Sequence, residues 1–306
     1  GQLRLRPSLL AGVPVSGEVL MAQRAALGGN AAPPVSPQAT TAPSRVQADL
    51  RVGSNRLTLQ GEGDPLGTGQ DDQTTVTLQA PALRELAPLA ALLPVLAPWA
   101  PRSGDVQAQV TVQGRWPDAR SDGTARLAGV QVGSLALRDG NARWALDTRS
   151  EAPLDLTLSL NDLTWDRQRL QALALTLQGT PRAHQLQLQA DVPQVPPLWV
   201  ETLFGQRAGP GTRATLQAEG GWRRDALGGG GLWSGRLRSL QVTGQVRAPG
   251  AGSAAPVASP GSTSSAVARW LDARDLPLEV HFTPAGGLDE LRAGAGSAQL
   301  AQHVMV

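Results

Sequence analysis

Alternation of apolar and polar residues runs through most of this 306-residue chain and limits what it can fold into. In residues 154–160 four leucines alternate with Asp155, Thr157 and Ser159, and residues 106–112 alternate valine and alanine with glutamine and threonine. A period of two places every second side chain on the same face of a β-strand. The sequence therefore predicts an all-β protein whose strands each have one apolar and one polar face.

The same pattern recurs along the chain at irregular spacing. Further candidate strands are residues 46–52, 56–60, 74–80, 124–132, 134–138, 142–147, 173–177, 185–190, 214–219, 236–246 and 276–282. Short words such as Thr-Leu-Gln return several times, but without the fixed period of a propeller or a hexapeptide helix. We therefore expect one strand-and-turn unit used many times within one architecture.

Two long segments and one short apolar segment interrupt this pattern. Residues 28–45 and 248–265 are rich in Ala, Gly, Ser and Pro, which predicts long disordered loops. Residues 81–100 contain internal prolines and too few apolar residues for a membrane span, so we expect a short broken helix packed on the sheet, with Pro81 in its first turn. Residues 198–204 are a second helix candidate. The expected order is a β-repeat segment at 1–27, the loop 28–45, β-repeats at 46–247, the loop 248–265 and a further β-segment at 266–306.

The composition excludes several kinds of chemistry. The chain contains no Cys and no Lys, so thiol nucleophiles, disulfides, zinc–thiolate sites and a phosphate-loop lysine are impossible. Its 27 basic residues, all arginine, face 25 acidic residues, and no cluster of arginines interleaved with aromatic residues is present. A nucleic-acid partner is therefore not expected.

No catalytic, cofactor or metal site is predicted. His184, His281 and His303 lie far apart in the sequence, and none has a second ligand at metal-binding spacing. Paired acids, such as Asp272 and Asp275, stand beside turn-like residues and are expected to be solubilising turn acids. The tryptophans lie mostly near predicted strand ends, where we expect them to pack. The chain is therefore not expected to be an enzyme, and no cofactor is expected.

The apolar faces of so many strands must be hidden from water in one of two ways. Two sheets can cover each other as sandwiches, or one long sheet can curl so that its apolar face lines an open groove. Periodicity alone does not choose between them. The low aromatic content, 3% of the chain, favours the groove because bulky rings fill most closed cores.

One region resembles a known family. It reads WDRQRLQALALTLQGTPRAHQLQLQADV from Trp165 to Val192, LQAEGGW from Leu216, and LWSGRLRSLQVTG from Leu232. These words, in this order, are similar to the middle of the TamB family, the inner-membrane subunit of the translocation and assembly module, within the AsmA-like superfamily. Gly179, His184, Trp233, Gly235 and Leu237 occupy places in the family pattern, and the resemblance is best over residues 104–246.

The resemblance implies a long antiparallel sheet curled into an open, taco-like hydrophobic groove in the periplasm, with the parent protein anchored in the inner membrane. It implies a role in outer-membrane biogenesis, through phospholipid transport or through assembly and secretion of autotransporter-type proteins with a TamA-like partner. The chain shows neither the N-terminal anchor nor the C-terminal domain of the family, so we expect a middle fragment. The alternative is a structural or adhesive surface protein made of closed β-sandwich repeats.

In the groove hypothesis, phospholipid acyl chains contact the apolar side chains without directional bonds. The predicted lining consists of Val106, Val110, Val112, Leu154, Leu156, Leu158, Leu160, Leu173, Leu175, Leu177, Leu186, Leu188 and Leu216.

Overall fold

The described part of the chain is almost entirely β-strand, and the chain divides into two compact units. The structure, a computed structural model, describes residues 1–23, 44–63, 72–92, 95, 97–115, 118–149, 151–166, 168–193, 208–224, 231–246, 266–283 and 287–302. Unit 1 is Gly1–Arg149 and unit 2 is Ser150–Val306. The expected fold class, all-β with antiparallel strands and very little helix, is confirmed.

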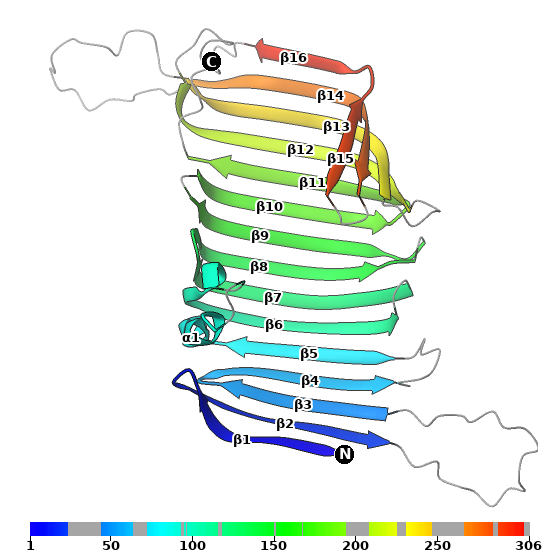
Figure 1. Ribbon diagram of the computed structural model, residues 1–306. Helices are drawn as coiled ribbons and strands as arrows, with labels where there is room; N and C mark the ends of the chain where they lie inside the picture. The colour runs from blue at the N-terminus through cyan, green and yellow to red at the C-terminus, as the bar shows by residue number, and fades with distance from the viewer. Residues whose placement is uncertain are drawn as a thin grey trace, which may run out of the picture. The chain divides into compact units, whose positions relative to one another are not determined.

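The described residues of unit 1 form eight strands that pair in chain order, each antiparallel to the next (Figure 1). They are β1 (Gln2–Leu10), β2 (Val13–Gln23), β3 (Ser44–Val52), β4 (Asn55–Gly63), β5 (Gln73–Ala80), β6 (Pro101–Arg115), β7 (Asp118–Val132) and β8 (Leu135–Asp147). Tight turns join several neighbours. Ala11 and Gly12, between β1 and β2, both have positive φ, which is typical of a type I′ hairpin turn.

Unit 2 contains the other eight described strands. They are β9 (Leu154–Trp165), β10 (Gln168–Thr180), β11 (Ala183–Val192), β12 (Ala208–Arg224), β13 (Gly231–Val246), β14 (Ala266–Phe282), β15 (Leu288–Ala293) and β16 (Ser297–Gln302). Strands β9 to β14 pair antiparallel in chain order. The last two strands both pair with β14. Strand β15 pairs along the C-terminal half of β14, and β16 pairs along its N-terminal half.

The expected broken helix between β5 and β6 is present. It consists of the 3-10 turn η1 (Leu83–Leu86), the single α-helical turn α1 (Ala87–Ala90) and the 3-10 turn η2 (Ala97–Trp99). Pro88, and not Pro81, stands in the first turn of the α-helix, where its missing N–H costs no hydrogen bond. The second helix candidate, residues 198–204, lies outside the described residues, as does the loop 248–265. The loop 28–45 also lies outside them, apart from its last two residues, which begin β3.

Asn55 attaches this helical insert to the sheet of unit 1. Its side chain is 4% exposed, and its amide nitrogen donates to the carbonyl oxygens of Val52 and Ala82, at 3.1 Å each. Its amide oxygen accepts from the backbone N–H of Ala82, at 3.2 Å. Glu85 makes a second attachment by accepting from the backbone N–H and the hydroxyl of Ser54, at 2.6 and 2.9 Å.

We expect Asn55→Ala to destabilise unit 1 by about 1 to 3 kcal/mol, because the N–H and carbonyl groups of Ala82 lose their buried partner. Urea unfolding followed by circular dichroism measures the change. The matched control is Ser54→Ala, which removes one exposed hydroxyl and leaves the backbone bond to Glu85 in place, so it should cost less than about 1 kcal/mol. Equal stability of the two variants would contradict the role given to Asn55.

Candidate functional site

The strand registers of unit 2 place its predicted leucines in continuous rows on one face of the sheet. One row runs across five strands, from β9 to β13, as Leu158, Leu175, Leu188, Leu216 and Leu240. Residues directly opposite each other in antiparallel strands point to the same face. A row perpendicular to the strands therefore forms an unbroken apolar band.

Parallel rows lie on both sides of this band. Leu160, Leu173, Ala190, Ala214 and Val242 form one of them, and Leu156, Leu177, Leu186, Ala218 and Leu237 form the other. Leu154 begins a fourth row, opposite Gly179. The structure thus brings all ten predicted leucines together on one surface, which we call the leucine face of unit 2.

The leucine face is open. None of its ten predicted leucines is buried, and each is partly exposed to solvent. The described part of unit 2 contains a single sheet, so no second sheet covers these side chains there. A closed sandwich would have buried them, since facing sheets pack their inner side chains together.

The three predicted valines lie in unit 1, on β6. Val106, Val110 and Val112 pair with Ala80, Val76 and Thr74 of β5, and they share one face of the sheet. Val106 and Val110 are partly exposed, and Val112 is 36% exposed. Unit 1 therefore carries an apolar face of the same kind.

The leucine face is most buried over β12 to β14, where the sheet bends. Ala218, Leu237 and Ala273 are at most 6% exposed and pack with partly buried residues of the same face, among them Leu186 and Leu276. Arg238 and Trp270 are extra residues in the pairings of β13 with β12 and of β14 with β13. Such bulges bend a strand and increase its twist. Side chains of one sheet bury one another in this way where the sheet is concave, so we infer that the leucine face is concave here.

Sequence reasoning missed the part of the leucine face that lies on β13 and β14. The missed residues include Leu237, Leu240, Val242, Leu271, Leu276 and Leu278. The alternation over residues 236–246 and 276–282 was a usable signal, and it predicted the strands. Because of the bulge at Arg238, Leu237 and Leu240 lie on the same face although they are three positions apart. Alternation of every second residue therefore does not predict that they share this face.

The opposite face of unit 2 is polar and carries ion pairs. Arg213 binds Asp191 at 2.6 Å, and Arg269 and Arg274 both bind Asp272. The pKa of the Asp272 carboxyl is lowered, chiefly because the Arg274 side chain donates to it. The prediction that Asp272 is a turn acid is wrong, because this residue lies inside β14 under its two arginines. The lowered pKa keeps the carboxylate charged, and the two arginines occupy its oxygens. A general acid must carry a proton, so Asp272 does not suit that role.

Tryptophans pack over glycines at several strand ends. A Cβ atom on Gly123, Gly220, Gly231 or Gly244 would come closer than 3.0 Å to the ring of Trp144, Trp233, Trp222 or Trp270, respectively. The missing side chains thus leave room for the rings. Packing near strand ends is therefore observed for Trp144, Trp222 and Trp233; Trp165 is 62% exposed, and Trp116 lies outside the described residues.

His184 takes part in this packing and does not stand near a metal site. Its Nε2 accepts from the Trp233 indole N–H at 2.8 Å, and its Nδ1 lies 3.1 Å from the Thr180 carbonyl oxygen. Both ring nitrogens are thus used within the sheet. Among the described residues, no three His, Asp or Glu side chains are grouped so that they could hold a metal ion.

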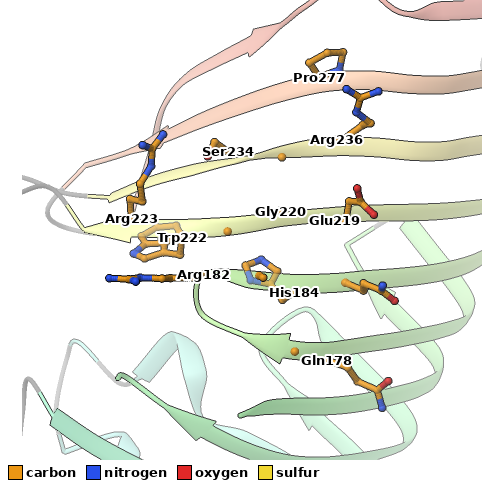
Figure 2. Close-up of a pocket in the computed structure, with 15 residues that line it drawn as sticks. Gln178, Arg182, His184, Glu219, Gly220, Trp222, Arg223, Ser234, Arg236 and Pro277 are labelled. Atoms are coloured by element: carbon orange, nitrogen blue, oxygen red, sulfur yellow. The ribbon is translucent and has the colours of Figure 1, made fainter. Parts of the chain in front are cut away.

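An open hollow of about 980 Å³ lies at one end of strands β10 to β14, next to this histidine (Figure 2). Gly179, Gly220, Gly221 and Gly235 contribute to its lining and present no side chains. Arg182, Arg223 and Arg236 also line it, together with Glu219. The hollow is therefore an open, arginine-bearing surface at these strand ends, on the polar face of the sheet.

One family model matches the chain, over residues 35–197, and is described as the N-terminal domain of TamB. The match covers more than half of the chain and overlaps the region of sequence resemblance. The chain belongs to the TamB family. This is a family of transport and assembly proteins and not of enzymes, so the chain has a TamB-like role in biogenesis of the cell envelope.

The other two comparisons add no relative. No curated protein and no solved structure matches the chain. Members of the TamB family work with TamA in envelope assembly, and family membership implies an envelope-associated protein. In the described part of the chain, no helix has the length and apolarity needed to cross a membrane.

Proposed function

We propose that the apolar faces of this TamB-family chain shield phospholipid acyl chains during transport from the inner to the outer membrane. The observation that carries the proposal is the leucine face of unit 2, in which rows such as Leu158, Leu175 and Leu188 stay partly exposed on a single sheet. An exposed apolar surface of this extent marks a binding site for something apolar. Burying it yields about 25 cal/mol per Å² without specific polar partners, which suits acyl chains.

Family membership supports the cellular setting that we propose. In our proposal the chain works in the periplasm, and its parent protein is anchored in the inner membrane. A TamA-like outer-membrane protein is the expected partner, reached through parts outside this chain. Assembly and secretion of autotransporter-type proteins is the second role that the family suggests, and the leucine face is open to either cargo.

The structural alternative, a surface protein of closed sandwiches, needs a second sheet over the leucines. The described part of unit 2 contains a single sheet. In a sandwich, the central leucines would be shielded from water, whereas all ten predicted ones are partly exposed here. The observed exposure therefore favours the lipid-shielding proposal over the adhesive one.

Native mass spectrometry of the purified chain, produced in a Gram-negative host, tests the proposal. We expect masses of one or more phospholipids above that of the bare protein, released by mild collisional activation. Headgroup identity follows from fragmentation of the released lipid. A chain that is lipid-free, stays lipid-free after incubation with phospholipid vesicles and unfolds cooperatively would overturn the proposal and favour the closed structural protein.

A further inference from the structure

The helical insert between β5 and β6 exposes large apolar side chains to solvent. Leu92, Val95 and Trp99 are 54%, 82% and 64% exposed, and all three lie in one short segment of the chain. Single exposed apolar residues are ordinary on a protein surface, whereas a group of them marks a contact with something apolar. The insert is therefore a candidate docking segment.

Both ends of the insert are fixed to unit 1. At its start, the Asn55 side chain binds the carbonyl oxygen and the N–H of Ala82. Near its end, the Pro98 carbonyl oxygen lies against the turn between β7 and β8, where a Cβ atom on Gly133 would be 2.8 Å from it. Gly133 also has a φ of +57°, which glycine adopts without strain. The exposed side chains thus belong to a segment that the sheet holds in place.

The insert lies beside one end of the apolar face of unit 1, the face that carries Val106. Ala80 pairs with Val106 directly before the insert and is 0% exposed. Leu57 pairs with Leu78, two residues before Ala80, so it lies on the same face, where it is 37% exposed. Asn55, two residues before Leu57, binds the insert from this face. The insert therefore starts on the apolar side of the sheet, next to the point where the open face begins.

The chemistry of the insert suits a lipid surface. Residues 86–101 carry no charge, and the Trp99 indole N–H is the only polar side-chain group among them. Exposed arginines, Arg84 and Arg102, flank this stretch on both sides. The carboxylate of Glu85 is already engaged by an N–H and a hydroxyl of the turn between β3 and β4. A protein interface typically needs about ten hydrogen bonds, whereas an anionic bilayer surface favours apolar side chains, tryptophan and adjacent cations.

The opposite strand ends of unit 1 match a bilayer less well. They carry ion pairs between Arg45 and Glu62, Arg120 and Asp122, and Arg149 and Asp147. The carboxylates of these pairs would be repelled by an anionic surface, and removing them from water is unfavourable. The strand end that carries the insert is therefore the better candidate for membrane contact.

We propose that the helical insert docks unit 1 on the surface of an anionic phospholipid bilayer. Leu92, Val95 and Trp99 enter the headgroup region, and Arg84 and Arg102 contact lipid phosphates. Docking places the open apolar face of unit 1 beside a source of lipid. The docking goes beyond the proposed function and does not require it; only the passage of lipid onto the apolar face rests on that function.

Flotation of the chain with phospholipid vesicles in a density gradient tests the docking. The vesicles contain phosphatidylcholine alone or a mixture with phosphatidylglycerol. We expect the chain to float with the mixed vesicles. The insert variant Leu92→Ser/Val95→Ser/Trp99→Ser should bind them at least about tenfold more weakly, because its apolar side chains are no longer buried in lipid. Arg84→Gln/Arg102→Gln should lower the preference for anionic vesicles by about tenfold, since each arginine near a charged membrane adds to the attraction.

The matched control is Met21→Ser/Leu288→Ser/Leu291→Ser. It removes three apolar side chains of similar exposure, 57%, 65% and 60%, from other parts of the chain, and it should float like the unmodified protein. Leu158→Asp, which alters the leucine face, should also float normally. Because all the substituted side chains of the insert variant are exposed, its circular dichroism spectrum should be unchanged.

Normal flotation of the insert variant, or no flotation of the unmodified chain, would overturn the docking and leave the lipid-shielding proposal in place. Loss of flotation in Leu158→Asp would assign vesicle binding to the leucine face and also overturn the docking. Self-association of the unmodified chain that disappears in the insert variant, without flotation of either, would instead assign the insert to contact with a second copy of the chain.

Discussion

Replacing Leu158 by aspartate is expected to remove most bound phospholipid, at least about tenfold, while the chain keeps its β-type circular dichroism spectrum. Leu158 begins the row that continues through Leu175 and Leu188. An acyl chain lying on this row would strip water from the new carboxylate, which costs several kcal/mol without a partner. In the free protein the carboxylate stays hydrated, because the face is open. Native mass spectrometry gives the lipid occupancy, and Leu175→Asp should behave alike.

The neighbouring Thr157 provides a matched control on the same strand. It is exposed on the polar face, paired with Thr176, and Thr157→Asp introduces the same charge one residue away. We expect its lipid occupancy to equal that of the unmodified chain. Equal lipid occupancy in Leu158→Asp and Thr157→Asp would contradict the lipid-shielding proposal. Global unfolding of Leu158→Asp would show that the leucines form a closed core, as the sandwich alternative requires.

The substitution Gly221→Ala, which adds one methyl group, is expected to destabilise unit 2 by about 2 to 3 kcal/mol. This is the upper part of the range for overpacked sites. A Cβ atom on Gly221 would come closer than 3.0 Å to the Arg182 carbonyl oxygen. The colliding atom belongs to the backbone and not to a flexible side chain, so the turn before β11 must move away. That movement breaks the bond from the Trp222 N–H to the Pro181 carbonyl. Urea unfolding of Gly221→Ala measures the loss.

Gly61→Ala is the control, since Gly61 is also inside a strand but the atom nearest to its Cβ would be the Thr74 hydroxyl oxygen, at 3.2 Å. That side chain can shift by a few tenths of an ångström, so we expect a change of less than about 1 kcal/mol. Alanine also has less conformational entropy than glycine in the unfolded chain, which favours the folded state. If Gly221→Ala proved as stable as Gly61→Ala, the close approach of the turn to β12 would be wrong.

Local residue patterns were sufficient to predict the strands and their two faces. Alternation is a local property of each strand, because the side-chain period is set by the extended backbone alone. It therefore predicted the leucines of β9, β10 and β11 on one face, and the registers bring them into rows. The broken helix at 81–100 was equally predictable from its prolines and alanines, since these are short-range preferences.

Where a strand continues and where it bends depends on its pairing with neighbouring strands, which local patterns do not predict. Residues 134–138 and 142–147 were predicted as separate strands, since Asp139 and Gly140 are typical turn residues. They form one strand, β8, because Gly140 pairs with Leu127 and is buried there. The bulges at Arg238 and Trp270 were likewise invisible, since a bulge is defined by the partner strand.

The sequence also left open whether the apolar face is covered, and only the pairing of the strands answers this within each unit. Alternation is the same in a sandwich and in an open sheet, because it records which side is apolar and not what lies against it. The hollow at the end of β12 has the same origin. Arg182 and Arg223 are far apart in the sequence. Both line this hollow because the turn before β11 approaches β12, where Gly221 leaves room for the turn's backbone.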